Sequence, residues 1–486
     1  MTELLAQTTP RIDLAPIGPE LLLLLTGLLV LIGAALVPRA HGALLLISLA
    51  GVIAAAAASI PLWSWGGERT VLGGTVVADR FSVVIRLVIL AVAALGLILG
   101  HHYYTRTGEG RGEFYALVLI CALGMTLFSA SAELITAFLA LEILSLSLYV
   151  LAATSRRLAA SEASMKYFLL GSFSSAFFLF GVAMAYGATG TTRLSDVATA
   201  LSGQTGSRAL ALTAMALLAV GFAFKVSVVP FHMWTPDVYQ GAPTPVTAFM
   251  SAGTKVAAFG ALIRVFDTAL QPLTWDWTPL LWALAAVTVV VGSFLAIAQS
   301  DIKRMLAYSS IAHAGFIMTG LTAPGQDGIS AALFYLVAYA AMIVGAFAVV
   351  MLVSERGEER TSLASYGGLA RRSPLLAGLM TVFLLSMAGI PPAAGFIAKV
   401  QVFRAAISAG HWELALIGVL ASVVAAFFYI RVLVLMYMQE PVGEAHPDRS
   451  AAPVLGAAVA AALTLVLGVF PGLVAGLLDK ASVLRW

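Results

Sequence analysis

The sequence has little of two kinds of residue that most soluble proteins use freely, charged residues and cysteine. Only 10% of its 486 residues are charged, against about 25% in typical globular proteins. The hydrophobic fraction is 60%, and the mean hydropathy is +0.98. A chain so poor in charge predicts an all-α polytopic membrane protein and excludes a soluble domain.

Cysteine occurs once, at Cys121. One thiol excludes an intrachain disulfide and cannot hold an iron–sulfur cluster, which usually takes four protein ligands. The sequence also lacks a P-loop and any credible cluster of metal ligands. The net charge of +3 and the absence of a basic tail do not favour nucleic acid as a partner. Energy for any transport must therefore come from an ion gradient or from a partner protein.

Long apolar runs dominate what is present. A bilayer core about 30 Å thick needs roughly 20 apolar residues per helix, and we expect about fourteen transmembrane helices on this basis. The predicted segments are residues 18–37, 42–63, 80–100, 113–130, 134–153, 164–187, 209–240, 245–266, 278–299, 303–322, 329–353, 374–408, 412–438 and 453–476.

The basic residues of the short loops predict the orientation, because they favour the cytoplasmic side. Loops after odd-numbered segments contain Arg39, Arg106, Arg111, Arg156, Arg157, Lys303, Arg304, Arg356, Arg360, Arg371, Arg372 and Arg449. The other side, with both termini, contains Arg11, Arg69, Arg80, Arg193, Arg208, Arg404, Lys480 and Arg485. This bias of twelve to eight places the odd loops in the cytoplasm and both termini outside.

Lysine is found where hydrophobicity should exclude it. Four of the six lysines, Lys166, Lys225, Lys255 and Lys399, lie in or at the edge of apolar segments, and Glu142 lies in the middle of another. Each such charge costs about 2.5 to 3.5 kcal/mol at the bilayer centre. Ionisable groups at this depth usually mark an ion or proton path.

The type of cation supports a proton path. Arginines outnumber lysines 21 to 6, yet the deep positions are lysine, which can change its charge state when buried, whereas arginine effectively never deprotonates. His232 and His313 are further candidates for proton transfer, because histidine titrates near neutral pH. For His313, a role as a hydrogen-bonded core residue is an equal alternative. For Lys166, the equal alternative is a side chain that extends to the membrane surface.

Three arginines in the apolar segments have a different expected role. Arg86, Arg264 and Arg431 lie closer to the segment ends. Long basic side chains at such positions commonly extend to the membrane interface. We therefore expect these three residues to be interface anchors.

Two segments are predicted to be broken helices. Pro230 and Pro236 follow Lys225 in the seventh segment, and residues 391–392, both proline, precede Lys399 in the twelfth. Proline removes a backbone donor and leaves carbonyls that need another polar partner inside a membrane. Two broken helices, one in each half of a chain, are typical of transporters with inverted repeats.

The repeats divide the chain into four parts. Helices 4 to 8 and helices 9 to 13 form two five-helix units, and an odd number of helices inverts the second unit relative to the first. The predicted boundaries are an N-terminal three-helix segment at 1–110, a first repeat at 111–268, a second repeat at 269–440 and a final helix at 441–486.

Three long motifs carry a resemblance to a known family. They are GFAFKVSVVPFHMWTPDVYQGAPTPVTAFMSAGTKVAAF from Gly221, SDIKRMLAYSSIAHAGFIMTG from Ser300 and AGIPPAAGFIAKVQVF from Ala388. In combination they resemble the antiporter-like membrane subunits of respiratory complex I. The stretch from Asp237 to Phe249 is similar to one branch of that family in particular.

The resemblance implies a proton-translocating subunit of a bacterial cytoplasmic membrane. In the family a glutamate and a lysine form a pair, a central lysine follows, and a further lysine lies at the proposed exit. The residues that match the family's polar positions are Glu142 and Lys225 for the pair, Lys255 for the centre, Lys399 for the exit, and Lys166 and His232 in addition.

The resemblance also implies that the cofactors lie elsewhere. NADH, FMN, iron–sulfur clusters and quinone are expected in partner subunits, with none on this chain, and the partners are other membrane subunits of the complex and membrane lipid. Two alternatives remain at this stage: a Mrp-type cation/proton antiporter subunit, or a structural subunit of the same complex that does not pump.

Overall fold

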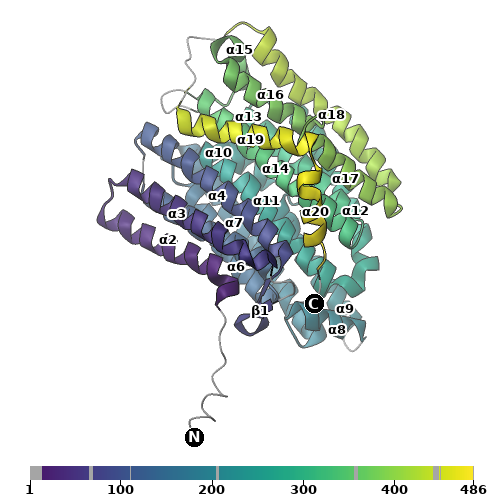
Figure 1. Cartoon of the computed structure of the whole chain (residues 1–486). Helices are drawn as coiled ribbons and strands as arrows, with labels where there is room; N and C mark the ends of the chain where they lie inside the picture. Colours follow the sequence, from purple (N-terminus) through teal and green to yellow (C-terminus); the bar gives the residue numbers. More distant parts are fainter. Residues whose placement is uncertain are drawn as a thin grey trace.

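The computed structural model describes residues 14–64, 69–109, 111–203, 207–354, 359–441, 448 and 450–484. Nearly all of this part of the chain is helical, and the long helices lie side by side (Figure 1). Helices α2 and α3 form one edge of the bundle, and α18 lies at the opposite edge. The predicted all-α class is therefore confirmed.

The elements before the middle of the chain begin and end as follows: α2 Gly18–Leu36, α3 His41–Ser59, β1 Arg69–Val71, β2 Val76–Ala78, α4 Arg80–Thr107, α5 Glu113–Ala130, α6 Leu134–Ala152, α7 Leu158–Thr189, α8 Leu194–Ser202, α9 Arg208–Val226, α10 Trp234–Gly241 and α11 Thr244–Arg264. Those that follow are α12 Thr274–Ile297, α13 Ile302–Leu321, α14 Gln326–Val353, α15 Leu369–Arg372, α16 Pro374–Ala388, α17 Ala394–Ser408, α18 Trp412–Met438, α19 Ala451–Val469 and α20 Gly472–Ala481.

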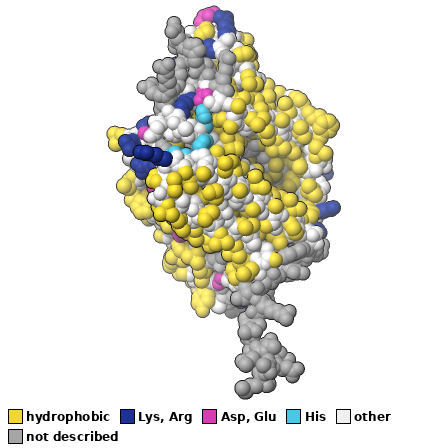
Figure 2. All heavy atoms as spheres, turned by 60° about the vertical axis from the view of Figure 1, so that its left-hand side comes forward, with side chains coloured by type: hydrophobic (Ala, Val, Ile, Leu, Met, Phe, Trp, Pro, Cys, Tyr) yellow, Lys and Arg dark blue, Asp and Glu magenta, His cyan; other side chains and the backbone are white. Residues whose placement is uncertain are grey.

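Twelve helical segments of the described residues are long and apolar enough to cross a membrane. Large hydrophobic side chains are exposed along their outer faces, among them Leu25 on α2, Phe173 on α7 and Val423 on α18. Figure 2 shows one face of the molecule on which hydrophobic side chains predominate, with the histidine side chains and several basic ones toward its upper end. The chain is a multi-pass membrane protein, and the count of fourteen stays a prediction.

Both predicted helix breaks are confirmed. The segment 209–240 divides into α9, which ends at Val226, and α10, which begins at Trp234. Pro236 does not interrupt a helix, contrary to the expectation. It lies in the first turn of α10, where a missing N–H is tolerated. The segment 374–408 divides into α16 and α17, with residues 389–393 between them.

A small hairpin was not predicted by the sequence. Strands β1 and β2 pair antiparallel, with Arg69 opposite Ala78. Gly73 and Gly74 turn the chain with positive φ angles of 72° and 90°, which glycine adopts without steric cost. The hairpin, α8 and α20 lie at the same end of the bundle, and α15 lies at the other (Figure 1).

Helix α11 forms the centre of the core. Every one of its residues from Thr244 to Arg264 is buried. It packs against α4, α5 and α14. This burial is unusual for a membrane helix, which normally has a lipid-facing side, and it places Lys255 away from lipid.

The loops that were predicted to share one side do meet. Arg106, after the third predicted helix, forms an ion pair of 2.7 Å with Asp448, after the thirteenth. Arg157 and Glu359, after the fifth and the eleventh, form another at 3.0 Å. These contacts agree with the predicted alternation of the loops. Arg11, Arg356, Arg449 and Arg485, which contributed to the orientation argument, lie outside the described residues.

Candidate functional site

The first candidate pair lies between α6, α7 and α9. Lys225 is buried in the last turn of α9, just before the helix break. Its Nζ lies 5.8 Å from the ring centre of Tyr149 and 5.3 Å from that of Tyr167. Glu142 lies halfway along α6. The described residues show no ion pair or hydrogen bond between Glu142 and Lys225, so their association stays a prediction.

No hydrogen bond completes this pair. Lys225 Nζ, Glu142 Oε1 and the hydroxyl of Tyr167 are buried and have no hydrogen-bond partner among the described residues. A buried polar atom without a partner costs about 1 to 3 kcal/mol, and more when it is charged. These groups therefore favour water or rearrangement, which suits a site where a proton moves.

The first helix break leaves carbonyls that aromatic and turn residues satisfy. The indole N–H of Trp234 donates to the Phe224 carbonyl at 3.0 Å. Ser227 adopts a left-handed conformation, with φ of 65°, directly after α9 ends. His232 is half-buried within the break. No hydrogen bond joins its ring to Lys225 or Lys255 in the described part of the chain, so a role in proton transfer stays a prediction.

A row of aromatic rings leads from Lys225 toward the centre of the molecule. Tyr167 stacks on Trp234 with ring centres 4.6 Å apart. Trp234 in turn contacts Tyr239 edge-on at 6.2 Å. Two of these three rings, those of Tyr167 and Tyr239, carry buried hydroxyl groups that have no hydrogen-bond partner among the described residues. The row connects the surroundings of Lys225 with those of α13.

Lys255 lies at the centre of the molecule. Its side chain is fully buried on α11. Lys255 Nζ donates to the carbonyl oxygen of Ser310 on α13 and lies 5.6 Å from the ring centre of Tyr339 on α14. The Tyr339 hydroxyl donates to Ser310 Oγ at 2.7 Å. Unlike Lys225, Lys255 therefore has a hydrogen-bond partner.

His313 continues the polar network one turn further along α13. Its Nδ1 is hydrogen-bonded to the Tyr335 hydroxyl at 2.7 Å, and its Nε2 lies 3.3 Å from the Tyr429 hydroxyl. The His313 ring lies 5.4 Å from that of Tyr339, which Lys255 contacts, and 6.1 Å from that of Phe316, which Lys399 contacts. His313 therefore lies between the central and the final lysine, and its role in the relay stays a prediction.

Lys399 is buried on α17, across the second helix break. Its Nζ donates to the Ala388 carbonyl at 3.0 Å, which is the last residue of α16. It also lies 4.7 Å from the ring centre of Phe316. The lysine thus satisfies a carbonyl that the break leaves without a helical partner. A polar cleft of about 320 Å³ adjoins the same helix, and Gln401 and Arg404 of α17 line it with Asp479.

Lys166 does not join these residues. Its side chain is 44% exposed, and its Nζ forms ion pairs with Glu162 at 2.7 Å and Asp237 at 3.0 Å. Asp237 also pairs with Arg304 at 2.6 Å. The structure therefore places Lys166 in a partly exposed ion-pair cluster rather than among the buried lysines.

Two arginines that we expected to anchor the membrane interface are buried instead. Arg264 binds the carboxylate of Asp79 through two hydrogen bonds of 2.9 and 3.0 Å. Arg86 forms an ion pair of 2.8 Å with Glu20. Asp79 lies in a loop far from Arg264 in the sequence, and Glu20 lies on α2. The spacing of the sequence therefore did not predict either contact. The anchor interpretation is wrong for both arginines.

The sequence did not point to the other tyrosines beside the lysines and His313, which are Tyr167, Tyr339, Tyr335 and Tyr429. Tyrosine in an apolar segment is usually a core residue, and nothing in the spacing distinguishes those beside a lysine. Among the residues that the structure describes, no group of three or more His, Cys, Asp or Glu side chains could hold a metal ion. The polar groups that the structure does gather are suited to carrying protons.

Comparison with known proteins defines the class. Residues 131–425 match the family described as NADH:quinone oxidoreductase/Mrp antiporter, transmembrane. The match extends over more than half of the chain and includes every relay candidate. The chain belongs to this family of membrane proteins.

The most similar relatives narrow the class further. The chain is 43% identical over 473 residues to NADH-quinone oxidoreductase subunit N of Trichlorobacter lovleyi, covering 96% of this chain and 97% of that protein. It is 52% identical over 385 residues to the subunit N of Rhodococcus opacus, covering 78% and 71%. A chain of respiratory complex I from Thermus thermophilus with bound aureothin matches with 36% identity, a TM-score of 0.81 and coverage of 95% and 99%. The resemblance found in the motifs is confirmed.

Proposed function

We propose that this chain is the proton-translocating membrane subunit of the subunit N type in a bacterial NADH:quinone oxidoreductase. Electron transfer from NADH to quinone takes place in other subunits of the complex, and this chain uses the released energy to move protons. The observation that carries the proposal is the burial of Lys225, Lys255 and Lys399, with His313 between the last two. The similarity to relatives named subunit N supports it.

The relay begins at Glu142 and Lys225. A shift of charge at Glu142 changes the proton affinity of Lys225, because the two groups interact and neither has a hydrogen-bond partner among the described residues. The proton then passes along hydroxyl groups toward Lys255. A coupled series of this kind titrates as a unit, so that each protonation alters the next.

The second part of the relay leads to Lys399. His313 has both ring nitrogens within reach of a tyrosine hydroxyl, Tyr335 on one side and Tyr429 on the other. Such a histidine can accept a proton on one nitrogen and release one from the other. Lys399 then passes the proton to the cleft beside α17. His232 and Lys166 serve as polar contacts near the entrance.

The relay sits in two inverted repeats with the boundaries given above, 111–268 and 269–440. Each repeat contributes one broken helix and one lysine beside it. The segment 1–110 and the helix within 441–486 flank them. Loops after odd-numbered helices lie in the cytoplasm and both termini outside, in the bacterial cytoplasmic membrane.

The chain supplies no redox centre of its own under this proposal. NADH, FMN, iron–sulfur clusters and quinone bind in partner subunits, and this chain contacts other membrane subunits of the complex and lipid. Its contribution is the charge series in its core. A Mrp-type antiporter would instead exchange sodium for protons without any dehydrogenase, and vesicles lacking the rest of the complex would detect that activity.

The variant Lys225→Ala tests the proposal in membranes that contain the whole complex. We expect normal assembly but a large loss of both quinone-linked NADH oxidation and proton pumping. NADH oxidation with an artificial electron acceptor serves as the control, because it bypasses the membrane arm. Unchanged pumping in assembled Lys225→Ala complex would reject the relay and leave a structural subunit.

A further inference from the structure

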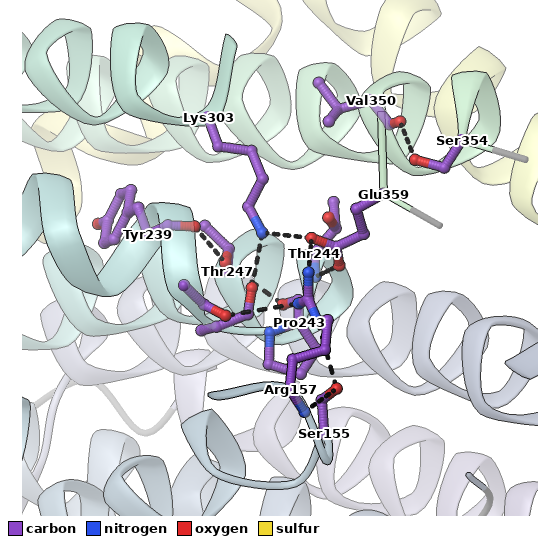
Figure 3. Close-up of polar contacts among 12 residues, drawn as sticks. Ser155, Arg157, Tyr239, Pro243, Thr244, Thr247, Lys303, Val350, Ser354 and Glu359 are labelled. Atoms are coloured by element: carbon purple, nitrogen blue, oxygen red, sulfur yellow. Dashed lines mark hydrogen bonds and ion pairs between the residues drawn. The ribbon is translucent and has the colours of Figure 1, made fainter. Parts of the chain in front are cut away.

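A buried carboxylate from the loop after α14 joins three separate elements (Figure 3). Glu359 Oε2 accepts from Lys303 at 2.9 Å and from Arg157 at 3.0 Å. Its Oε1 accepts from the backbone N–H of Thr244 at 2.9 Å. We call these four residues the Glu359 cluster. It links the first predicted repeat, through Arg157 and Thr244, with the second.

The Lys303–Glu359 pair is enclosed, whereas the Arg157 side chain is 36% exposed. The Lys303 side chain is 0% exposed and that of Glu359 is 3% exposed. Breaking a buried ion pair by removing one partner leaves an uncompensated charge, which is strongly destabilising. The loop itself is attached to the start of α13, because Ile302 N–H donates to the Thr361 carbonyl at 2.7 Å. Glu359 is therefore held in place from both directions.

The Glu359 cluster also binds the turn between α10 and α11. Lys303 Nζ donates to the Ala242 carbonyl at 2.6 Å, and Arg157 donates to the Gly241 carbonyl at 3.4 Å. The cations thus lie at the C-terminus of α10, and the carboxylate lies at the N-terminus of α11. Each charge has the sign that the adjoining helix end favours.

Both helices that begin at the cluster lead to the same relay contact. Lys255 lies eleven residues after Thr244 on α11, which corresponds to about 16 Å along the helix. Ser310, whose carbonyl accepts from Lys255, lies seven residues after Lys303 on α13, or about 10 Å. A shift at the start of either helix therefore moves one partner of the Lys255 hydrogen bond.

We propose that Glu359 is a positioning residue. It fixes the starts of α11 and α13 relative to each other and thereby sets the contact between Lys255 and Ser310. This inference rests on the proton-translocating function proposed above. The relay would work in the absence of the cluster, but with its central lysine displaced from its partner and with fewer protons moved per electron pair.

The test uses Glu359→Gln in membranes that contain the whole complex, with protons pumped per NADH as the readout. Glutamine keeps an oxygen for the Thr244 N–H but removes the charge that balances Lys303 and Arg157. In the complex that assembles, we expect the ratio to fall about two-fold or more. The amount of complex is measured separately, because loss of the buried charge also lowers stability. An unchanged ratio would overturn the inference. The inference would also be overturned if a smaller amount of assembled complex fully explained the loss of proton pumping.

A charge-balanced variant separates positioning from simple stability. In the double variant Lys303→Gln with Glu359→Gln, both amides can keep the hydrogen bonds to Ala242 and Thr244 without any buried charge at either site. We expect this variant to recover a large part of the lost ratio, and no recovery would count against the inference. Should Glu359→Gln fail to assemble, Arg157→Gln takes its place. A lower ratio of protons pumped per NADH would then support the inference, and a ratio equal to that of the wild type would contradict it.

Two controls complete the experiment. Glu440→Gln breaks the ion pair between Glu440 and Arg371, which is 2.6 Å long but well exposed, and should leave the ratio unchanged. Lys225→Ala, measured in the same membranes, reports on the relay itself. Normal pumping in Lys225→Ala would reject the proposed function, whereas loss in Lys225→Ala with a normal ratio in Glu359→Gln would reject only the positioning role.

Discussion

The two lysine sites on either side of the aromatic row are built differently. Around Lys225, the ammonium, one oxygen of Glu142 and the hydroxyl of Tyr167 have no hydrogen-bond partner in the described part of the chain. Lys255 Nζ, both ring nitrogens of His313 and the hydroxyl of Tyr339 have hydrogen-bond partners. The first site is therefore open to water or to rearrangement, and the second is a formed network. A proton relay needs both, an adaptable group that responds to charge and a fixed path that carries it.

The largest effect is expected at Lys255. Replacing it with methionine should reduce proton pumping about ten-fold or more, because it removes a group that transfers protons. Lys255→Arg should not restore pumping, because arginine does not release its proton. Proton uptake by inverted membranes measures this, and pumping by Lys255→Arg at the wild-type rate would contradict it.

The same substitution also tests the difference in hydrogen bonding. Lys255→Met loses a hydrogen bond from a charged group, worth about 1.5 to 3 kcal/mol. Lys225→Met removes an ammonium that has no such bond and should not destabilise the protein. Thermal denaturation of the purified complex compares the two, and equal losses of stability would remove the distinction between the sites.

Glu142→Gln is expected to lower pumping several-fold, less than the loss of Lys255. The charge that acts on Lys225 disappears, but the lysine itself remains. Glu142 Oε1 has no hydrogen-bond partner among the described residues, so the substitution breaks no hydrogen bond at this atom. A large loss of stability with normal pumping would indicate a structural role for Glu142 instead.

Gly389→Ala should disturb Lys399 without removing it. Gly389 has a φ of 86°, and an added Cβ would lie 3.0 Å from Lys399 Cδ and 3.2 Å from its Nζ. We expect a destabilisation of about 1 to 2 kcal/mol and a partial loss of pumping. Gly410→Ala is the matched control, since Gly410 has a similar φ of 88° and nothing lies within 4 Å of its added Cβ. Equal effects of the two substitutions would contradict the role of the close contact.

Paired removal of tyrosine hydroxyls gives a smaller and more direct comparison. Tyr335→Phe removes a hydrogen bond to His313 and should cost about 1 kcal/mol. Tyr167→Phe removes a hydroxyl that has no hydrogen-bond partner in the described residues and should be close to neutral for stability. Chemical or thermal denaturation distinguishes them, and equal costs would show that the first site is as well bonded as the second.

The smallest expected effect concerns pH. Burial raises the pKa of Glu359, but Lys303 and Arg157 outweigh it and hold the pKa below its ordinary value. Tyr103, Tyr104 and Tyr366 are further titratable neighbours. Because its pKa is lowered, the Glu359 carboxylate stabilises the folded protein at pH values above the ordinary carboxylate pKa of about 4.3. This contribution to stability is lost as the pH falls. The stability difference between wild type and Glu359→Gln should therefore be constant from about pH 6 to 8 and narrow only below about pH 5. A difference that changes near neutral pH would show that another group titrates.

The sequence predicted the helices better than it predicted the contacts between them. Apolar runs located the spans, and proline beside Lys225 and Lys399 located both breaks, because each signal is local. The partners of Arg264 and Glu359 could not be predicted, because those pairs join residues from 56 to 202 positions apart through short polar loops. Lys166 shows the same limit, since its helix α7 begins at Leu158, six residues before the predicted start, and lies beside α10.

The complete burial of α11 has a consequence for how the protein enters the membrane. Of the twelve candidate spans, the one formed by this helix is the least hydrophobic, and all of it is enclosed by protein. Its favourable contacts are with neighbouring helices rather than with lipid tails, and in a membrane such packing supplies most of the association energy. Integration of this helix during biosynthesis therefore depends on the helices around it, and a chain truncated soon after Arg264 would lack α14, one of the surfaces that retain it.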